Sequence, residues 1–186
     1  LADITLGDPQ GGAERLEHLA GTSHGSAAAR ASLYGQAGQA WMIARQPDRA
    51  FAAETLALVL LPDDPDLLIT RAAASGGLNR FQDAVEDLTR ALRSDPRRVD
   101  ALVFRAAAWR HLGRLRKAEE DIERAFVLDA NSPEAHLERG ILRQRRGDNA
   151  GAEADWDAVT ALSPGTATAE LAQHDLARMQ AEPQQR

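Results

Sequence analysis

The chain is 186 residues long, contains no cysteine and carries a formal net charge of −6 at pH 7. Its length suits one compact domain or a short array of repeats. The lack of cysteine excludes disulfides, thiolate metal sites and cysteine nucleophiles. The acidic balance argues against a general nucleic-acid binder, which needs a basic field. The longest apolar run, 56–61, is six residues, far below the about 20 residues of a membrane span.

A motif of small residues recurs every 34 residues. Its first positions are Ala50, Ala84, Ala118 and Ala152. Seven residues after each lie Ala57, Ala91, Ala125 and Val159, and twelve after each lie Pro62, Pro96, Ala130 and Pro164. A period of about 34 residues is typical of stacked helix–turn–helix units. The sequence therefore divides without insertions into four windows, 31–64, 65–98, 99–132 and 133–166.

These residues resemble the tetratricopeptide repeat family. The small residue that the family has within its first helix is matched by Gly38, Ala72, Ala106 and Gly140. Three positions further on, the family has a large residue, which Trp41 and Trp109 match and Ser75 and Arg143 do not. The bulky residue of the family's second helix is matched by Leu88, Ile122 and Trp156 but not by Glu54. The resemblance covers about three quarters of the chain. It implies an all-α, right-handed superhelical solenoid of helix–turn–helix repeats with a C-terminal capping helix.

In chain order, residues 1–25 form an N-terminal extension, punctuated by glycines, in which we expect a loose leader and a short helix at 13–20. The repeats occupy 26–166. Their helices are expected at 26–45, 48–61, 66–75, 80–93, 98–112 (or from 100), 115–128, 133–146 and 150–162. Turns are expected at Gly76-Gly77, at Gly113 and at Gly147-Asp148. The segment 167–186 should supply a capping helix to about residue 181, whose polar side makes the end soluble, and a tail at 183–186.

Three windows carry an arginine and an aspartate 16 residues apart. The pairs are Arg71 with Asp87, Arg105 with Asp121, and Arg139 with Asp155, whereas the first window has Ala37 and Ala53. We expect each pair to join the two helices of its hairpin in a partly buried ion pair. Removing one partner of such a pair would cost about 3–5 kcal/mol.

In the resembled family, the first helices of successive repeats line a concave surface. The predicted peptide-binding groove has an apolar floor of Ile69, Ala73, Val103, Phe104, Ala107, Leu137 and Ile141, and a polar rim of Arg110, His111, Gln144 and Arg145. Residues 71–117 hold ten arginines and one lysine against five acids. A cationic rim favours an acidic segment of a partner.

Some members of the family hold a chaperone's terminal carboxylate with lysines and asparagines at these inner positions. Here the comparable positions are Ile69, Ala73, Val103 and Ala107, so that clamp is missing. The five histidines are scattered and form no i, i+4 zinc pair, and neither a phosphate-binding glycine loop nor a nucleophile motif is present. We therefore predict no enzyme activity, no cofactor and no metal.

The sequence predicts a non-catalytic scaffold that holds a peptide or helix of another protein in the apolar groove. The alternative is a structural, self-associating repeat protein whose groove is filled by its own N-terminal arm. We expect a monomer or a weak homodimer, without nucleic acid or a membrane span. The start at Leu1-Ala2-Asp3 is compatible with a cleaved signal peptide, which favours export, with the cytoplasm as the alternative.

Overall fold

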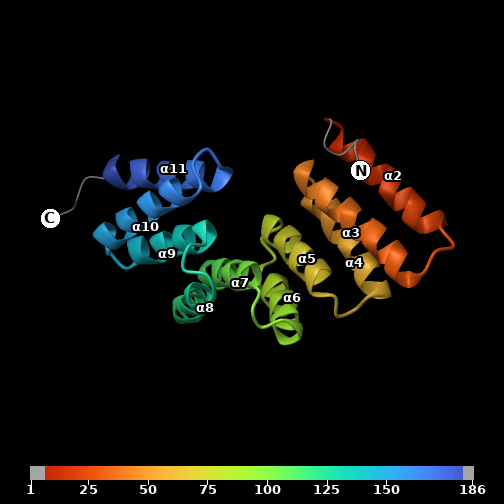
Figure 1. The fold of residues 1–186 in the computed structure, drawn as a ribbon, viewed down its shortest axis with the longest axis horizontal. Coiled ribbons are helices and arrows are strands. Elements are labelled where there is room, and N and C mark those ends of the chain that lie inside the picture. The colour runs from red at the N-terminus through yellow and green to blue at the C-terminus, as the bar shows by residue number, and fades with distance from the viewer. Residues whose placement is uncertain (1–6, 182–186) are drawn as a thin grey trace. The chain divides into compact units, whose positions relative to one another are not determined.

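The structure is a computed structural model and describes residues 7–181, which contain ten helices and no strand. The helices are α2 (Pro9–Thr22), α3 (Ala27–Ile43), α4 (Pro47–Leu60), α5 (Pro65–Gly77), α6 (Phe81–Ser94), α7 (Val99–His111), α8 (Leu115–Leu128), α9 (Pro133–Arg145), α10 (Asn149–Leu162) and α11 (Ala167–Ala181). The fold class is all-α and built from helical hairpins, as predicted (Figure 1). The chain forms two compact units, residues 1–96 and 97–186. Within residues 7–181, no helix combines the length and the apolarity that crossing a membrane requires.

Each hairpin of the repeat turns through the same backbone device. At the end of every first helix one residue has a positive φ: Arg45 at 57°, Asn79 at 58°, Gly113 at 70° and Gly147 at 83°. A backbone hydrogen bond closes each turn, from the amide of residue 46, 80, 114 or 148 to the carbonyl five residues earlier, at 2.8–3.0 Å. The 34-residue period of the sequence is therefore also the period of the backbone geometry.

The turn of the second window differs from the prediction. Gly76 and Gly77 were expected to end the helix at Ser75, but α5 continues to Gly77 and the positive φ falls on Asn79. Asparagine tolerates this conformation better than most side chains do. The register of the repeat thus sets the position of the turn, and the two glycines remain helical.

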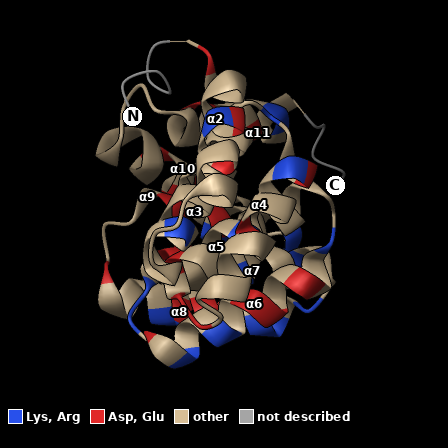
Figure 2. Cartoon of the chain, turned by 90° about the vertical axis from the view of Figure 1, so that its right-hand side faces the viewer, with Lys and Arg blue, Asp and Glu red and all other residues tan. Residues whose placement is uncertain are grey.

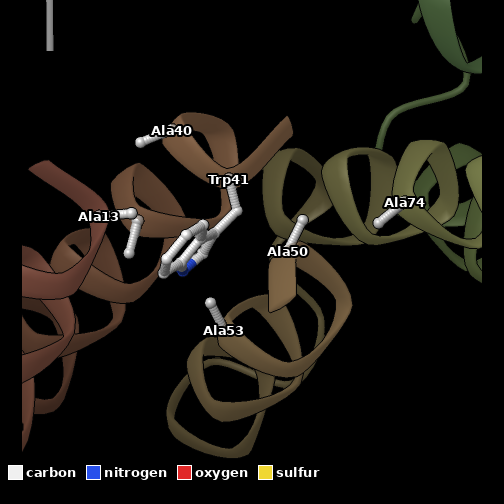
Figure 3. Packing of buried hydrophobic residues seen from close by; sticks show 7 residues of the cluster. Ala13, Ala40, Trp41, Ala50, Ala53 and Ala74 are labelled. Atoms are coloured by element: carbon white, nitrogen blue, oxygen red, sulfur yellow. The ribbon is translucent and has the colours of Figure 1, made fainter. Parts of the chain in front are cut away.

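Unit 1 contains α2 to α6 and has a core of small residues around one indole ring. Trp41 on α3 is fully buried and lies among Ala13 of α2, Ala50 and Ala53 of α4, and Ala74 of α5 (Figure 3). Its indole N–H donates to Glu17 on α2 at 2.8 Å. Alanines let the helix backbones approach closely enough to enclose the ring.

The N-terminal extension is more ordered than predicted. The expected short helix at 13–20 is longer, Pro9–Thr22, with the Asp8 side chain accepting the Gly11 amide at its start. Its Ala13 and Ala20 are fully buried, so α2 packs against α3 as part of unit 1. The first six residues of this extension, and the predicted tail at 183–186, lie outside the described residues.

Unit 2 contains α7 to α11. Ser132 and Asp148 cap α9 and α10, accepting the amides of Ala135 and Gly151. The capping helix α11 buries small side chains against the last repeat. The cluster comprises Ala152, Trp156, Val159, Ala169 and Ala172, with Leu137, Ile141, Leu176 and Met179 packed against it. The last apolar hairpin is therefore covered by α11.

Candidate functional site

Each of the three arginine–aspartate pairs joins the two helices of its own hairpin. Arg71 on α5 holds Asp87 on α6 through two hydrogen bonds of 2.7 Å, from Nε and Nη2. Arg105 on α7 holds Asp121 on α8 in the same way, at 2.7 and 2.6 Å. The aspartate side chains are only 3–6% exposed in the three pairs. Two parallel bonds to one carboxylate are the strongest geometry that arginine offers.

The pair of the fourth repeat is extended into a small network. Arg139 donates to Asp155 at 2.6 Å, Arg143 donates to the same carboxylate at 2.8 Å, and Nδ1 of His136 lies 3.0 Å from it. Arg139 also stacks on the ring of Phe126, 3.8 Å from its centroid. Arg143 departs from the family pattern, and it contacts the Asp155 carboxylate together with His136.

The rim residue Arg110 is engaged within the protein. Its guanidinium on α7 donates to the Glu138 carboxylate on α9 at 2.6 Å, and both side chains are nearly buried. Burial raises the pKa of Glu138, while the Arg110 hydrogen bond opposes that rise. We expected Arg110 to meet acidic groups of a partner; instead it bridges two neighbouring first helices of unit 2.

The remaining predicted groove residues of unit 2 differ in exposure. Phe104 on α7 is 41% exposed, whereas Val103 beside it is 5% exposed. On the second half of the face, Ala107, Leu137, Ile141 and Gln144 are half-buried, and His111 and Arg145 are exposed. Open apolar surface on this face is thus concentrated at Phe104 rather than spread along a continuous stripe.

The electrostatics of the unit 2 rim depend on Arg145. Burial lowers the pKa of His111, and the positive charges of Arg110 and Arg145 lower it further. A histidine with a depressed pKa is mostly neutral at pH 7. Arg145 is therefore the exposed positive charge of this predicted rim.

The predicted groove residues of unit 1 lie on α5. Ile69 is 6% exposed and Ala73 is half-buried. In the hairpin formed by α5 and α6, the charged residues lie mainly on α6, acidic in its first half and basic in its second half (Figure 2). Ile69 therefore contributes to the packing of unit 1 more than to its open surface.

One buried polar residue was not assigned a role from the sequence. Glu54 on α4 is fully buried, and neither of its carboxylate oxygens has a hydrogen-bond partner among the described residues. The signal was present as a departure from the family pattern, because Leu88, Ile122 and Trp156 fill the same slot in the later repeats. Glu138 also went unassigned, since its partner Arg110 lies 28 residues away and no local spacing connects them.

Across residues 7–181, no three acidic or histidine side chains gather in a way that would hold a metal ion. The described hairpins define the class of the protein, a helical-repeat protein with a capping helix at its C-terminal end. No family model matches the chain, and no curated protein matches it.

Solved structures do resemble it. TTC0263, a tetratricopeptide repeat protein of Thermus thermophilus, is similar with a TM-score of 0.74 and 21% identity, over 81% of this chain and 83% of that chain. The tetratricopeptide repeat domain of Arabidopsis OM64 gives a TM-score of 0.60 and 29% identity, over 62% and 95%. The first such domain of Spaghetti (RPAP3), bound to the HSP90 peptide SRMEEVD, gives 0.61 and 27%, over 64% and 98%. These matches show that the chain has the fold of tetratricopeptide repeat proteins, the family that its motifs resemble.

Proposed function

We propose that the chain is a non-catalytic scaffold that binds a peptide or helix of a partner protein on the first-helix face of unit 2. The exposed residue of this face is Phe104 on α7, next to the buried Val103 and the half-buried Ala107. Leu137 and Ile141 on α9 adjoin it and are partly covered, because they pack against the cluster that α11 closes. The Arg110–Glu138 ion pair supports the proposal because it fixes the two helices against each other. A partner would therefore meet a preorganised surface, which lowers the entropy lost on binding.

The exposed ring of Phe104 carries the proposal. An aromatic side chain that is 41% exposed leaves apolar area in water, and aromatic anchors supply much of the energy of protein interfaces. At the corresponding position the fourth repeat has Glu138, which is buried and paired. In the part of the chain that the structure describes, Phe104 is the exposed aromatic residue on a first helix.

The rim suggests a partner with an acidic group next to its apolar anchor. Arg145 is exposed at the end of α9, and His111 is exposed at the end of α7. Because the pKa of His111 is lowered, it would gain its charge only on acidification. Binding of a carboxylate should therefore strengthen as the pH falls through the titration of His111.

The peptide-bound Spaghetti domain supports the idea that this fold can hold a peptide with acidic residues. The present chain would do so with different chemistry. Where a chaperone clamp needs polar side chains, it has Ala73 and Ile69 on α5 and Val103 and Ala107 on α7. We therefore propose that an apolar anchor, rather than a terminal carboxylate, is the main determinant of binding.

A phage-displayed library of random peptides, selected on the intact chain, tests the proposal. We expect enriched peptides to carry a large apolar residue close to an acidic one. Their affinities, measured by fluorescence anisotropy, should fall at least about tenfold in Phe104→Asp, as for an interface hot spot. The matched control is Val127→Asp, which changes an 87% exposed residue on the second helix α8 and should leave the affinity unchanged.

Equal affinities for wild type and Phe104→Asp, or no enrichment of any peptide, would overturn this proposal. Light scattering over a range of protein concentrations provides a separate measurement. A dimer that dissociates on dilution and is lost in Phe104→Asp would instead favour the self-associating structural role.

A further inference from the structure

Glu54 lies where the other repeats place a large apolar side chain. Its slot on the second helix is filled by Leu88 in α6, Ile122 in α8 and Trp156 in α10, all almost fully buried. Glu54 is as deeply buried as they are, and both of its carboxyl oxygens lack a partner among the described residues. An unpaired carboxylate in such a place is strongly disfavoured, so the neutral acid is the form that the fold accepts.

The backbone of α3 provides a space that fits this side chain. A Cβ added at Gly38 would lie 2.3 Å from Oε1 and 2.8 Å from the Cγ and Cδ atoms of Glu54. A Cβ at Gly35 would lie 2.7 Å from Leu67 and 3.9 Å from Oε2 of Glu54. The glycine at position 38 therefore allows the carboxyl group to lie directly against α3, whereas Gly35 makes room for Leu67.

The neighbouring charges on α5 and on the segment before it do not neutralise Glu54. The charge of Arg71 lowers the pKa of Glu54, but this guanidinium already makes two 2.7 Å hydrogen bonds to Asp87. Asp64, whose side chain caps α5, acts in the opposite direction. Burial raises the pKa of Glu54 to about 9, because Arg71 lowers it less than burial and Asp64 raise it.

The other packed elements supply few ionisable groups. On α3 these are Arg30, whose Nε donates to the Ala20 carbonyl at 2.8 Å, and the buried Tyr34. On α4 itself they are Asp48, exposed in the first turn, and Arg49, which pairs with Glu14. On α5 the remaining one is Asp66, also exposed in its first turn. None of these makes a hydrogen bond to the carboxyl group of Glu54.

We propose that Glu54 makes the α3–α4 hairpin a proton-linked element, which is closed while the carboxyl group is neutral and opens as that group ionises. In the open hairpin Glu54 would meet water and return toward its ordinary pKa of 4.5. Between pH 4.5 and about 9 the closed state binds one more proton than the open state. Opening therefore releases a proton, and its equilibrium constant rises by up to about tenfold per pH unit in this range.

Hydrogen–deuterium exchange of the intact chain tests this inference. After correction for the intrinsic exchange chemistry, opening of α3 and α4 should increase steeply from pH 6 to pH 9. Glu54→Gln keeps the shape but cannot ionise, so its opening should be nearly independent of pH. The matched control is Glu86→Gln on α6, an exposed glutamate whose replacement should preserve the wild-type pH dependence.

A wild-type pH dependence that persists in Glu54→Gln would overturn the inference. A second measurement needs no variant and so remains decisive if Glu54→Gln does not fold. The assigned ¹³C resonance of the Glu54 carboxyl group should stay at its protonated position at pH 7 in the wild-type chain. Titration of that resonance near the ordinary glutamate pKa would overturn the inference equally.

Discussion

The first repeat and the three later repeats each bury a carboxyl group on the second helix, at adjacent positions of the repeat. In the later repeats the group is Asp87, Asp121 or Asp155, and an arginine of the first helix holds it. In the first repeat both ion-pair positions are alanine, and the buried acid is Glu54, one position further on, without a partner among the described residues. The same hairpin backbone therefore accommodates a buried carboxyl group that is paired with an arginine and one that has no such partner.

This difference separates what the repeat period controls from what it does not. The turns and the small residues recur at 34 residues in all four windows, so they follow from the backbone that every hairpin shares. The buried charges depend on which side chains meet across each hairpin. A hairpin whose buried carboxyl group is paired should keep its stability at moderately alkaline pH. The α3–α4 hairpin, which buries the unpaired Glu54, should lose stability there.

Breaking a paired repeat should have the largest effect on stability. Asp87→Ala leaves the mostly buried guanidinium of Arg71 without its carboxylate, and we expect a loss of about 3–5 kcal/mol. Arg71→Ala should cost a similar amount, and the double variant should cost clearly less than the sum of the two. Urea denaturation of the three variants measures this coupling. Small, additive losses would show that the pair contributes little.

Removing the Arg110–Glu138 ion pair between α7 and α9 should have the second-largest effect on stability, and this effect should depend strongly on pH. Arg110→Ala leaves Glu138 buried without its cation, so we expect a loss of about 3 kcal/mol at pH 8. Without Arg110, only the charge of Arg145 opposes the rise that burial causes in the pKa of Glu138, and the folded state then binds more protons than the unfolded state. The loss should therefore shrink toward pH 5.

Denaturation curves at pH 5 and pH 8 measure this change. Arg145→Ala on the same face is the control, because its side chain is exposed and its removal should leave stability nearly unchanged at both values. If Arg110→Ala were as stable as wild type, Arg110 would not stabilise the fold, and its predicted role in the binding rim would be favoured again.

Gly38, which lies beside Glu54, allows a sharper test of how Glu54 packs in the first repeat. In Gly38→Ala the new methyl group would lie 2.3 Å from Oε1 of Glu54. Overpacking should outweigh the better helix propensity of alanine, for a net loss of about 1–2 kcal/mol. The same substitution in a Glu54→Ala background should be neutral or stabilising, because the clash is gone. Thermal denaturation of the four proteins decides this, and an equal loss in both backgrounds would mean that Glu54 does not occupy the space beside Gly38.

The sequence was sufficient to predict the fold. Residues at fixed spacing, such as Ala84 and Ala118, predicted the helical hairpins, and the family resemblance implied the capping helix. The exposure of the candidate site was harder to predict. Val103 and Phe104 are adjacent apolar residues on one helix, yet one is buried and the other is open, because exposure depends on neighbours that the period does not specify. The Arg110–Glu138 contact likewise joins different repeats.

Breaking a solvent-exposed ion pair should have the smallest effect on the stability of the chain. Arg49 on α4 lies 3.4 Å from Glu14 on α2, and both side chains are about half exposed. Water and salt screen such a pair, so Glu14→Gln should change the free energy of unfolding by less than about 1 kcal/mol. The change should vanish in about 0.5 M salt, whereas the loss in Asp87→Ala should persist because that pair is shielded from solvent. If Glu14→Gln proved as damaging as Asp87→Ala, burial would not be what distinguishes the ion pairs of this chain.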